Sequence, residues 1–432
     1  FTGYAAIAYT LGFTIYIWWA LSIALVMFVG AYLVVPKWTL VRIRLNVESP
    51  TEYLKIRYNF ATQQLIAWIG VLLKLLDTAA KWVSIGILIN GFTGLPMHYG
   101  ILLAGLVSIS YVTMGGLWAD TANDMAQFVV QVLAGVAMFV IIGKALGGAG
   151  AVFDIWNRLP AENSLMFREP YTIGFACTFI FVLFISYNGG TWNLATRFLA
   201  SPDGKSAKKS ALLSGGLYLV WPLILFMPMW AAPLLIPNLA APENVYSMMT
   251  LRYLPAGLVG LVLASMFAAT MSMTASDANT VSSVLCRDIL PVAFPRLKRA
   301  DGSVPLWFAR VITFSFILFS IVIALNNEKF GGILGLIIKW FGGLIGPASI
   351  PMVLGIVPFW KHCGPVAAFS TILSGLVTFV IVNFGMAEAS LAVSVGSPVV
   401  VSLITFNLFE CVGRIRGTRV SPEIENFMTD ER

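Results

Sequence analysis

The sequence contains few charged residues and little that would form a reactive centre. Charged side chains make up 11% of the 432 residues, hydrophobic ones make up 58%, and the mean hydropathy is +0.85. This balance excludes an ordinary soluble globular protein. The two histidines lie far apart, and the four cysteines show no metal-ligand spacing. We therefore expect neither an enzyme with a nucleophile–base pair nor a structural metal centre.

What the sequence has instead is a series of long apolar runs. Many of them reach the ~20 residues that a helix needs to cross a bilayer. They predict an all-α, polytopic membrane helix bundle with the lipid bilayer as its surroundings. We expect one transmembrane domain over residues 1–413 and a polar tail over 414–432. The chain opens inside an apolar stretch at Phe1, so we expect a further segment before it. The expected spans are 13–36, 61–90, 98–114, 119–146, 171–200, 211–236, 255–290, 308–325, 333–360, 365–383 and 392–409.

The basic residues concentrate in alternate loops. Lysine and arginine are frequent in five of the segments that flank the spans and scarcer in the connections between those five. By the positive-inside rule the basic loops are cytoplasmic, which predicts an inner-membrane protein with a cytoplasmic C-terminus. The net charge of +7 is thus a topological signal, and we expect no nucleic-acid partner. The basic loops are 37–59, 197–209, 287–299, 361–362 and 414–419.

The segment 268–288 organises the chain, because its second half is too polar for an ordinary spanning helix. Ser272, Ser276, Asn279 and Ser283 follow the spacing i, i+4, i+7, i+11 and form one polar stripe. Asp277 lies beside it. Oxygen atoms from hydroxyls and a carboxylate suit a small hard cation. The alternative is that small hydroxyl residues only let helices pack closely in lipid.

Paired glycines interrupt another apolar run at Asn188-Gly189-Gly190. A broken helix at membrane depth is tolerated where it lines a cavity, and in transporters such breaks contact a substrate or an ion. A packing notch is the alternative. Gly115-Gly116 predicts a second break, between two spans.

Lys74, Asp77 and Lys81 share one helix face, since their spacing is i, i+3, i+7. Asp77 can pair with either lysine, which offsets part of the cost of burial. A purely structural salt bridge is one interpretation, and a polar contact in a binding cavity is the other.

Five motifs, in order along the chain, resemble those of the sodium/solute symporter family. The resemblance covers essentially the whole chain, and the set is specific although each motif alone is weak. The motifs are Glu48 to Tyr58, read as a Pro-Glu-Tyr-Leu-x-x-Arg-Phe connection; Gly115-Gly116-Leu117 with Asn123-Asp124 and Gln127; Tyr187 to Arg197; Met271-Ser272 to Asp288; and Phe359-Trp360-Lys361.

The resemblance implies the LeuT-type fold, with two inverted repeats of five helices and discontinuous helices. The first repeat would cover 1–146 and the second 171–360, followed by two extra C-terminal helices over 365–413. It also implies sodium-coupled symport of a small polar solute by alternating access. A proton-coupled or uncoupled carrier, and a solute sensor without net flux, remain alternatives.

The family's principal sodium site maps onto the carbonyl of Ala269, the hydroxyl of Ser272 and position 273. Position 273 is Met here, where the family usually has Ser or Thr, and a thioether is a poor ligand for a hard cation. A second sodium site of some members maps onto Asp124 and Ser276. Asp277, beside that stripe, is expected to supply a compensating charge or to carry a proton. Sodium is the expected coupling ion.

The family's solute site falls on three helices and the broken segment. Asp77 occupies a substrate-contact position and Lys81 lies one turn beyond, a pair that suits a carboxylate or a zwitterion. Where sugar carriers of the family have polar partners, this chain has other residues, which argues against a simple hexose. Aromatic side chains would wall the cavity. The expected solute contacts are Phe1, Trp19, Asp77, Lys81, Tyr187, Asn188, Thr191, Trp192 and Thr196, with Tyr4 and Trp18 in the wall.

Overall fold

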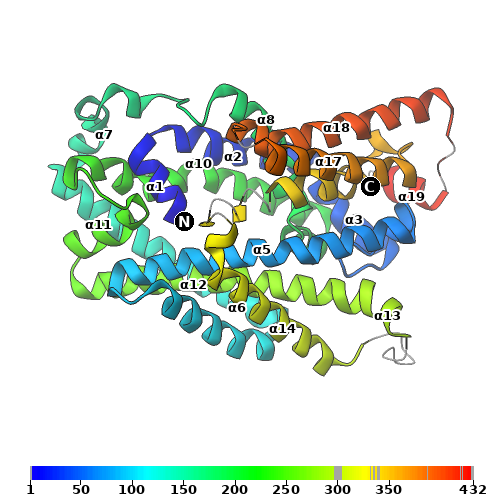
Figure 1. Cartoon of the computed structure of the whole chain (residues 1–432), viewed down its shortest axis with the longest axis horizontal. Coiled ribbons are helices and arrows are strands. Elements are labelled where there is room, and N and C mark those ends of the chain that lie inside the picture. The colour runs from blue at the N-terminus through cyan, green and yellow to red at the C-terminus, as the bar shows by residue number, and fades with distance from the viewer. Residues whose placement is uncertain are drawn as a thin grey trace.

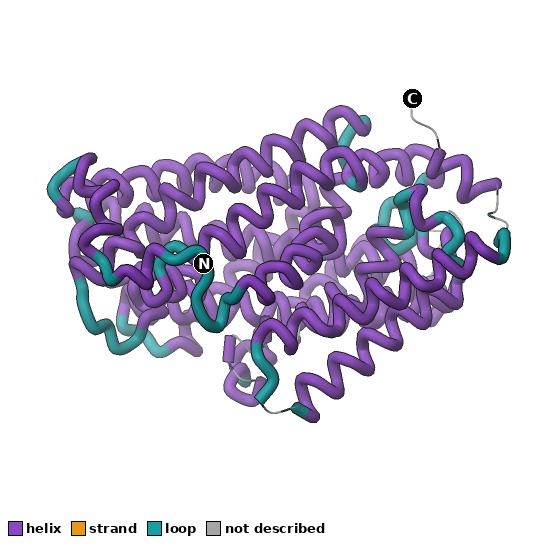
Figure 2. The backbone as a smooth tube through the Cα atoms, turned by 90° about the horizontal axis from the view of Figure 1, so that it is seen from above, coloured by secondary structure: helices purple, strands orange, loops and turns teal. Residues whose placement is uncertain are grey.

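The computed structural model describes residues 2–295, 304–330, 332–333, 336–337, 341–386, 388–418, 420 and 422–429. Within these ranges the chain is helical, and the only β feature is an isolated bridge between Arg168 and Tyr171 (Figure 2). The helices form one elongated bundle in which α5, α10 and α12 run along the long axis (Figure 1). The prediction of an all-α membrane bundle is confirmed. Phe1, an expected solute contact, lies outside the described residues.

The first half of the bundle begins with a short helix and continues through long ones. Its elements are α1 (Thr2–Leu11), η1 (Tyr16–Leu21), α2 (Ser22–Leu33), α3 (Val35–Leu45), α4 (Leu54–Arg57), α5 (Phe60–Thr93), α6 (Met97–Leu146), α7 (Ala149–Arg158) and η2 (Ala161–Ser164).

The second half contains the broken helix and the polar helix of the sequence analysis. Its elements are α8 (Ile173–Ile185), η3 (Ser186–Gly190), α9 (Asn193–Leu199), α10 (Gly204–Leu235), η4 (Pro242–Asn244), α11 (Val245–Tyr253), α12 (Ala256–Val284), η5 (Leu285–Ile289), α13 (Leu290–Ala293), α14 (Leu306–Leu325), η7 (Asn327–Phe330), η8 (Phe341–Ala348), α16 (Ser349–Leu354), η9 (Pro358–Trp360), α17 (Pro365–Gly385), α18 (Leu391–Ile415) and α19 (Pro422–Thr429).

Eight helical segments among the described residues are long and apolar enough to cross a membrane. They do not include α5, which is 34 residues long but carries Lys74, Asp77 and Lys81 on its central turns. Charged residues within a spanning helix almost always face the bundle interior, because exposing them to lipid is costly. The three charged side chains of α5 follow this rule, because all of them are mostly buried.

Helix α6 covers 50 residues, Met97–Leu146, and the expected break at Gly115-Gly116 falls within this range and stays a prediction. A straight helix of that length would measure roughly 75 Å. Yet both of its ends lie near the end of α5: Gly100 packs against Ile89, and Met138 accepts a hydrogen bond at 3.7 Å from Thr250 of α11. The chain therefore reverses direction within α6, and among the described residues Asp124–Leu146 is long and apolar enough to cross a membrane by itself.

The basic loops gather at one end of the bundle, where buried charges hold them together. Arg57 donates to the carbonyl oxygens of Gly355, Trp360 and Cys363 at 2.7–2.8 Å. Asp288, which is 3% exposed, accepts hydrogen bonds from Ser49 at 2.6 Å, from Thr51, and from Gln63 at 3.0 Å. The loop between α3 and α5 is thus tied to the ends of both α12 and α16. This clustering agrees with the positive-inside pattern in the sequence.

The helix from Ile173 is broken as the glycines predict. Gly189 has φ +121° and Trp192 has φ +60°, and between them the chain leaves helical geometry before α9 begins. A Cβ atom on Gly189 would lie 2.6 Å from the indole nitrogen of Trp38, so only glycine fits there. Trp38 Nε1 donates to the Asn188 carbonyl at 2.8 Å and Ser349 Oγ donates to the Gly190 carbonyl at 2.9 Å. The backbone groups freed by the break are therefore satisfied by neighbouring helices.

Candidate functional site

Four charged side chains meet in the middle of the bundle, three from α5 and one from α12. Lys74 Nζ lies 2.9 Å from Asp77 Oδ2 and 2.7 Å from Asp277 Oδ1. Lys81 Nζ lies 3.0 Å from Asp77 Oδ2 and also pairs with Asp277 Oδ2. Each carboxylate thus touches both lysines. We call Lys74, Asp77, Lys81 and Asp277 the charge quartet.

The quartet is buried and electrically balanced. The side chains of Lys74 and Asp277 are 1% and 0% exposed, whereas those of Lys81 and Asp77 are 15% and 10% exposed. Burying an unpaired charge costs several kcal/mol, and opposite charges with hydrogen-bonding geometry offset that cost. The spacing of Lys74, Asp77 and Lys81 places them on one face of α5, and that face meets α12 at Asp277. The expected pairing of Asp77 with a neighbouring lysine is confirmed.

A second polar network lies on another side of α12, toward α6 and α9. Ser272 Oγ donates to Asp124 Oδ1, and Arg197 Nη2 pairs with Asp124 Oδ2 at 2.5 Å. This network is more open than the quartet, since the Arg197 side chain is 47% exposed and that of Asp124 is 17% exposed. We call Asp124, Ser272 and Arg197 the Asp124 network. It offers carboxylate and hydroxyl oxygens together, which a hard cation prefers.

Aromatic rings from α1, η1, η3 and α10 pack against one another. Tyr4 of α1 packs at a tilt against Trp19 of η1 with ring centroids 4.7 Å apart, and Trp19 meets Tyr218 of α10 edge-on at 5.7 Å. The hydroxyls of Tyr218 and Tyr187 lie 3.4 Å apart. Helix α1, which carries Tyr4, packs against α5, which carries Asp77, and this links the group to the quartet. We call Tyr4, Trp19, Tyr187 and Tyr218 the aromatic wall.

The expected solute residues on the broken segment turn mainly toward its own backbone and toward α2. Asn188 Nδ2 donates to the carbonyls of Val26 and Phe184, and its Oδ1 packs so closely on Gly30 that a Cβ there would lie 1.6 Å away. Thr191 Oγ1 donates to the Ser186 carbonyl at 3.1 Å. Both side chains therefore stabilise the break in this conformation.

Two residues after the break reach the scaffold helices. The Trp192 indole is fully buried against Gly70 of α5, one turn from Lys74, and a Cβ on Gly70 would lie 2.0 Å from it. Thr196 Oγ1 lies 3.4 Å from Thr280 Oγ1 of α12. The break is thereby connected to the two helices that carry the quartet.

The expected sodium ligands separate into two groups in the structure. Asp124 and Ser272 are in contact, and Ala269 and Ser276 lie on the same helix as Ser272, about one turn away on either side. Asp277 is in the other group, because both of its oxygens are held by lysines of the quartet. Met273 is 50% exposed and lies one turn before Asp277 on α12.

Sequence reasoning missed three partners of these residues. It did not identify Arg197 as the partner of Asp124, Tyr218 as part of the aromatic wall, or the α5 lysines as partners of Asp277. One signal was available for the last of these. Two lysines and one aspartate on a single buried face leave an excess positive charge, which requires an acid from another helix.

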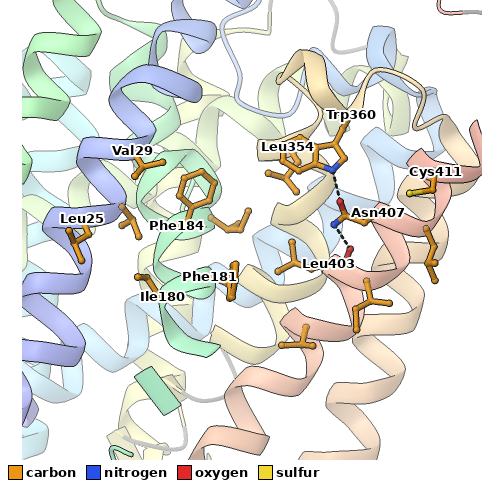
Figure 3. A pocket seen from close by; sticks show the side chains of 15 residues that line it. Leu25, Val29, Ile180, Phe181, Phe184, Leu354, Trp360, Leu403, Asn407 and Cys411 are labelled. Atoms are coloured by element: carbon orange, nitrogen blue, oxygen red, sulfur yellow. Dashed lines mark hydrogen bonds between the residues drawn. The ribbon is translucent and has the colours of Figure 1, made fainter. Parts of the chain in front are cut away.

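Two cavities of the described structure have linings that do not include the quartet. One, of about 740 Å³, is lined by residues of α2, α8, α16, η9 and α18, and nearly all of these side chains are apolar (Figure 3). Its amide, Asn407, accepts a hydrogen bond from Trp360 at 3.1 Å. Because a polar solute needs convergent polar groups, this cavity does not fit one.

The other cavity, of about 560 Å³, is lined by polar residues near the basic end, between α3, α9, α12 and α14. Asn279 and Ser283 of the predicted polar stripe line it, together with Thr196 of α9. The amide nitrogen of Asn279 is buried and has no hydrogen-bond partner among the described residues. Asn279 and Ser283, the C-terminal part of the stripe, therefore border a cavity, while their expected part in an ion site stays a prediction.

Comparison with known sequences gives a consistent result. The profile described as "Sodium:solute symporter family" matches residues 1–375. The chain is 25% identical over 387 residues to a sodium-dependent multivitamin transporter of Oryctolagus cuniculus, covering 82% of this chain and 56% of that protein. It is 24% identical over 361 residues to a sodium-coupled monocarboxylate transporter 2 of Bos taurus, covering 80% and 57%. The chain thus spans little more than half the length of these relatives.

Solved structures agree on the fold. A Na⁺-coupled sialic acid symporter in a substrate-bound, outward-open state superposes with a TM-score of 0.74 at 18% identity, covering 97% of this chain and 90% of that one. A nucleobase-cation-symport-1 family transporter in a closed conformation gives a TM-score of 0.52 at 14% identity, covering 99% and 95%. At these identities the similarity concerns the fold alone.

Proposed function

The chain belongs to the sodium:solute symporter family, and on that premise we propose that the protein is a secondary active transporter that couples uptake of a small polar organic solute to sodium. The observation that carries the proposal is the pair of polar networks on α12, one beside α5 and one beside α6. Polar and charged groups at membrane depth mark substrate and ion pathways. Two such networks on one helix supply separate places for a solute and a cation.

Sodium binds, in this proposal, at the Asp124 network. Asp124 and Ser272 bring oxygens together, and Ser276 and the Ala269 carbonyl lie within one turn on α12. Arg197 now pairs with Asp124, but its side chain is half exposed, so it can swing away when a cation enters. Asp277 is the weaker candidate, because sodium would have to displace two buried ammonium groups.

The solute binds between the accessible edge of the quartet and the aromatic wall. Lys81 and Asp77 form that edge, and Tyr4, Trp19 and Tyr187 lie nearby. An ammonium and a carboxylate beside aromatic rings suit a solute with a carboxylate or a zwitterionic group. Relatives named as monocarboxylate, multivitamin and pantothenate transporters support this solute class.

Transport proceeds by alternating access in this proposal. The first repeat would run over residues 1–146 and the second over 171–360, with α17 and α18 as the two extra helices. The protein would lie in the inner membrane of the cell, with its C-terminal tail in the cytoplasm. The broken helix α8–η3–α9 supports this mechanism, since its two halves can tilt independently about Gly189. The polar cavity beside Asn279 provides a route toward the basic end.

The test is uptake by proteoliposomes under an imposed inward sodium gradient, with the same gradient of potassium or choline as the control. The proposal predicts accumulation of a carboxylate or zwitterionic solute only with sodium. Equal uptake under all three cations would favour an uncoupled carrier, uptake driven by a proton gradient would favour proton coupling, and solute binding without flux would favour a sensor. Each of these three outcomes overturns the proposed sodium symport.

A further inference from the structure

The charge quartet is neutral, and this neutrality bears on how an anion can bind. Each lysine contacts both aspartates, so Lys74 and Lys81 have no positive charge in excess of that of Asp77 and Asp277. A carboxylate that approaches such a cluster gains little attraction unless one of the internal ion pairs opens. The quartet must therefore exchange one partner before it can hold a substrate anion.

The exposure of the four side chains indicates which ion pair of the quartet opens. Asp277 is 0% exposed and Lys74 is 1% exposed, whereas the side chains of Lys81 and Asp77 are 15% and 10% exposed. An incoming carboxylate therefore meets the Lys81–Asp77 pair first. If Asp77 releases Lys81, it keeps its contact with Lys74 at 2.9 Å. The substrate carboxylate then takes the place of Asp77 on Lys81, and every ammonium remains paired.

The exchange leaves the site with one negative charge too many. Two lysines, two aspartates and a substrate carboxylate sum to a charge of −1 inside the bundle, where an uncompensated charge is costly. A cation bound to the Asp124 network lies on the same helix, and Ser272 is five residues from Asp277, or about 8 Å along the axis. A sodium ion at that place restores neutrality and lowers the cost of binding the anion.

We propose that Asp77 is an internal counter-anion, whose displacement from Lys81 by a substrate carboxylate makes substrate binding depend on sodium. This inference rests on the proposed function and narrows its substrate class to carboxylates. It also explains why carboxylate binding depends on sodium, since the quartet and the bound carboxylate together carry a net negative charge. Coupling between two binding sites is typically about 5- to 150-fold in affinity, and sodium should tighten carboxylate binding within this range.

The first test uses the wild-type protein and matched pairs of probes. Purified protein in detergent is titrated with L-lactate and with nicotinate, and in parallel with their uncharged amides, L-lactamide and nicotinamide, at saturating sodium and in choline. The carboxylate probe that binds should bind at least about 5-fold more tightly in sodium. Its amide should bind weakly and without a sodium effect. Sodium-linked binding of an amide equal to that of its carboxylate would overturn the inference, and so would a wild-type substrate without a carboxylate.

The second test changes the charge count. In Asp77→Asn the quartet carries +1, so the bound carboxylate no longer creates excess negative charge and the ratio of affinities in sodium and choline should fall toward one. In the double variant Lys74→Gln/Asp77→Asn the Lys81–Asp277 pair is neutral again, and the ratio should return toward the wild-type value. Asp154→Asn, on the exposed face of α7, is the control, because it makes the same aspartate-to-asparagine change outside the quartet.

The results separate the inference from the function on which it rests. An unchanged sodium ratio in folded Asp77→Asn would overturn the counter-anion role, while sodium-driven uptake by the wild type would still support the symporter. A wild-type protein without sodium-driven uptake of any solute would overturn the proposed function itself. If Asp77→Asn does not fold, the wild-type comparison of carboxylate with amide still decides the inference.

Discussion

Two networks of charged residues lie on α12, and they differ in how tightly their charges are held. In the charge quartet Asp277 is fully buried and both of its oxygens contact lysines of α5. In the Asp124 network the carboxylate is partly accessible, and its cationic partner Arg197 is half exposed. The same helix therefore carries one network that is largely buried and one that is partly exposed.

This difference indicates a division of roles. Displacing Arg197 costs little, because an exposed ion pair contributes only about 0–1 kcal/mol. Removing one member of a buried set leaves an uncompensated charge and costs several kcal/mol. A coupling ion that must enter and leave in every cycle suits the first network. The second is suited to hold a fixed arrangement until a substrate of matching charge replaces one of its members.

The largest expected effect is on stability, from Asp277→Ala. The variant leaves Lys74 and Lys81 with one carboxylate between them, so the bundle buries a net positive charge. We expect the free energy of unfolding to fall by about 3–5 kcal/mol, measured by denaturant unfolding in detergent. Asp154→Ala on the exposed α7 should change it by less than about 0.5 kcal/mol. Equal losses for the two variants would show that the quartet does not stabilise the fold.

A smaller effect is expected from removing the quartet's charges in pairs. The single variants Lys74→Gln and Asp77→Asn each leave a charge in excess, whereas the double variant does not. The loss in the double variant should therefore be smaller than the sum of the two single losses by about 0.5–3 kcal/mol, the range found for residues in contact. A double-mutant cycle on the unfolding free energy measures this difference, and additive losses would contradict the shared network.

The Asp124 network should respond in sodium affinity more than in stability. Asp124→Asn removes the charged oxygen pair, and we expect the sodium concentration for half-maximal uptake to rise about tenfold, which corresponds to about 1.4 kcal/mol. The unfolding free energy without sodium should change by about 1 kcal/mol or less, because the network is partly exposed. A large loss of stability with unchanged sodium affinity would reverse the roles assigned to the two networks.

The smallest effect is expected at Arg197. Arg197→Gln removes the cation that pairs with Asp124, and stability should change by no more than about 1 kcal/mol. Sodium no longer competes with the guanidinium, so its affinity should rise a few-fold, as measured by the sodium dependence of uptake. Arg168→Gln, which removes an exposed pair with Glu162 at the far end of the bundle, is the matched control. A lower sodium affinity in Arg197→Gln alone would show that Arg197 helps to build the site.

Much of this arrangement could be predicted from the sequence, because it depends on local spacing. The face shared by Lys74, Asp77 and Lys81, the stripe on α12 and the break at Asn188-Gly189-Gly190 all follow from helical periodicity or from glycine chemistry. The break expected at Gly115-Gly116 falls within the range of α6 and stays a prediction.

The rest depends on tertiary contacts that local patterns do not contain. Asp277 meets lysines about 200 residues away along the chain, and Arg197 meets Asp124 across 73 residues. Adjacent residues on α12, such as Ser276 and Asp277, point about 100° apart, so they contact different helices. Sequence reasoning therefore placed Asp277 among the sodium ligands. That assignment stays a prediction, and the lysine contacts favour the quartet role instead.

The most direct measurement is equilibrium binding of radioactive sodium to the purified protein and to its Asp124→Asn and Asp154→Asn variants. The account predicts saturable binding in the wild type and in Asp154→Asn, and a loss of about tenfold or more in affinity in Asp124→Asn. Wild-type affinity for sodium in a folded Asp124→Asn protein would contradict the assignment of the coupling ion to this network.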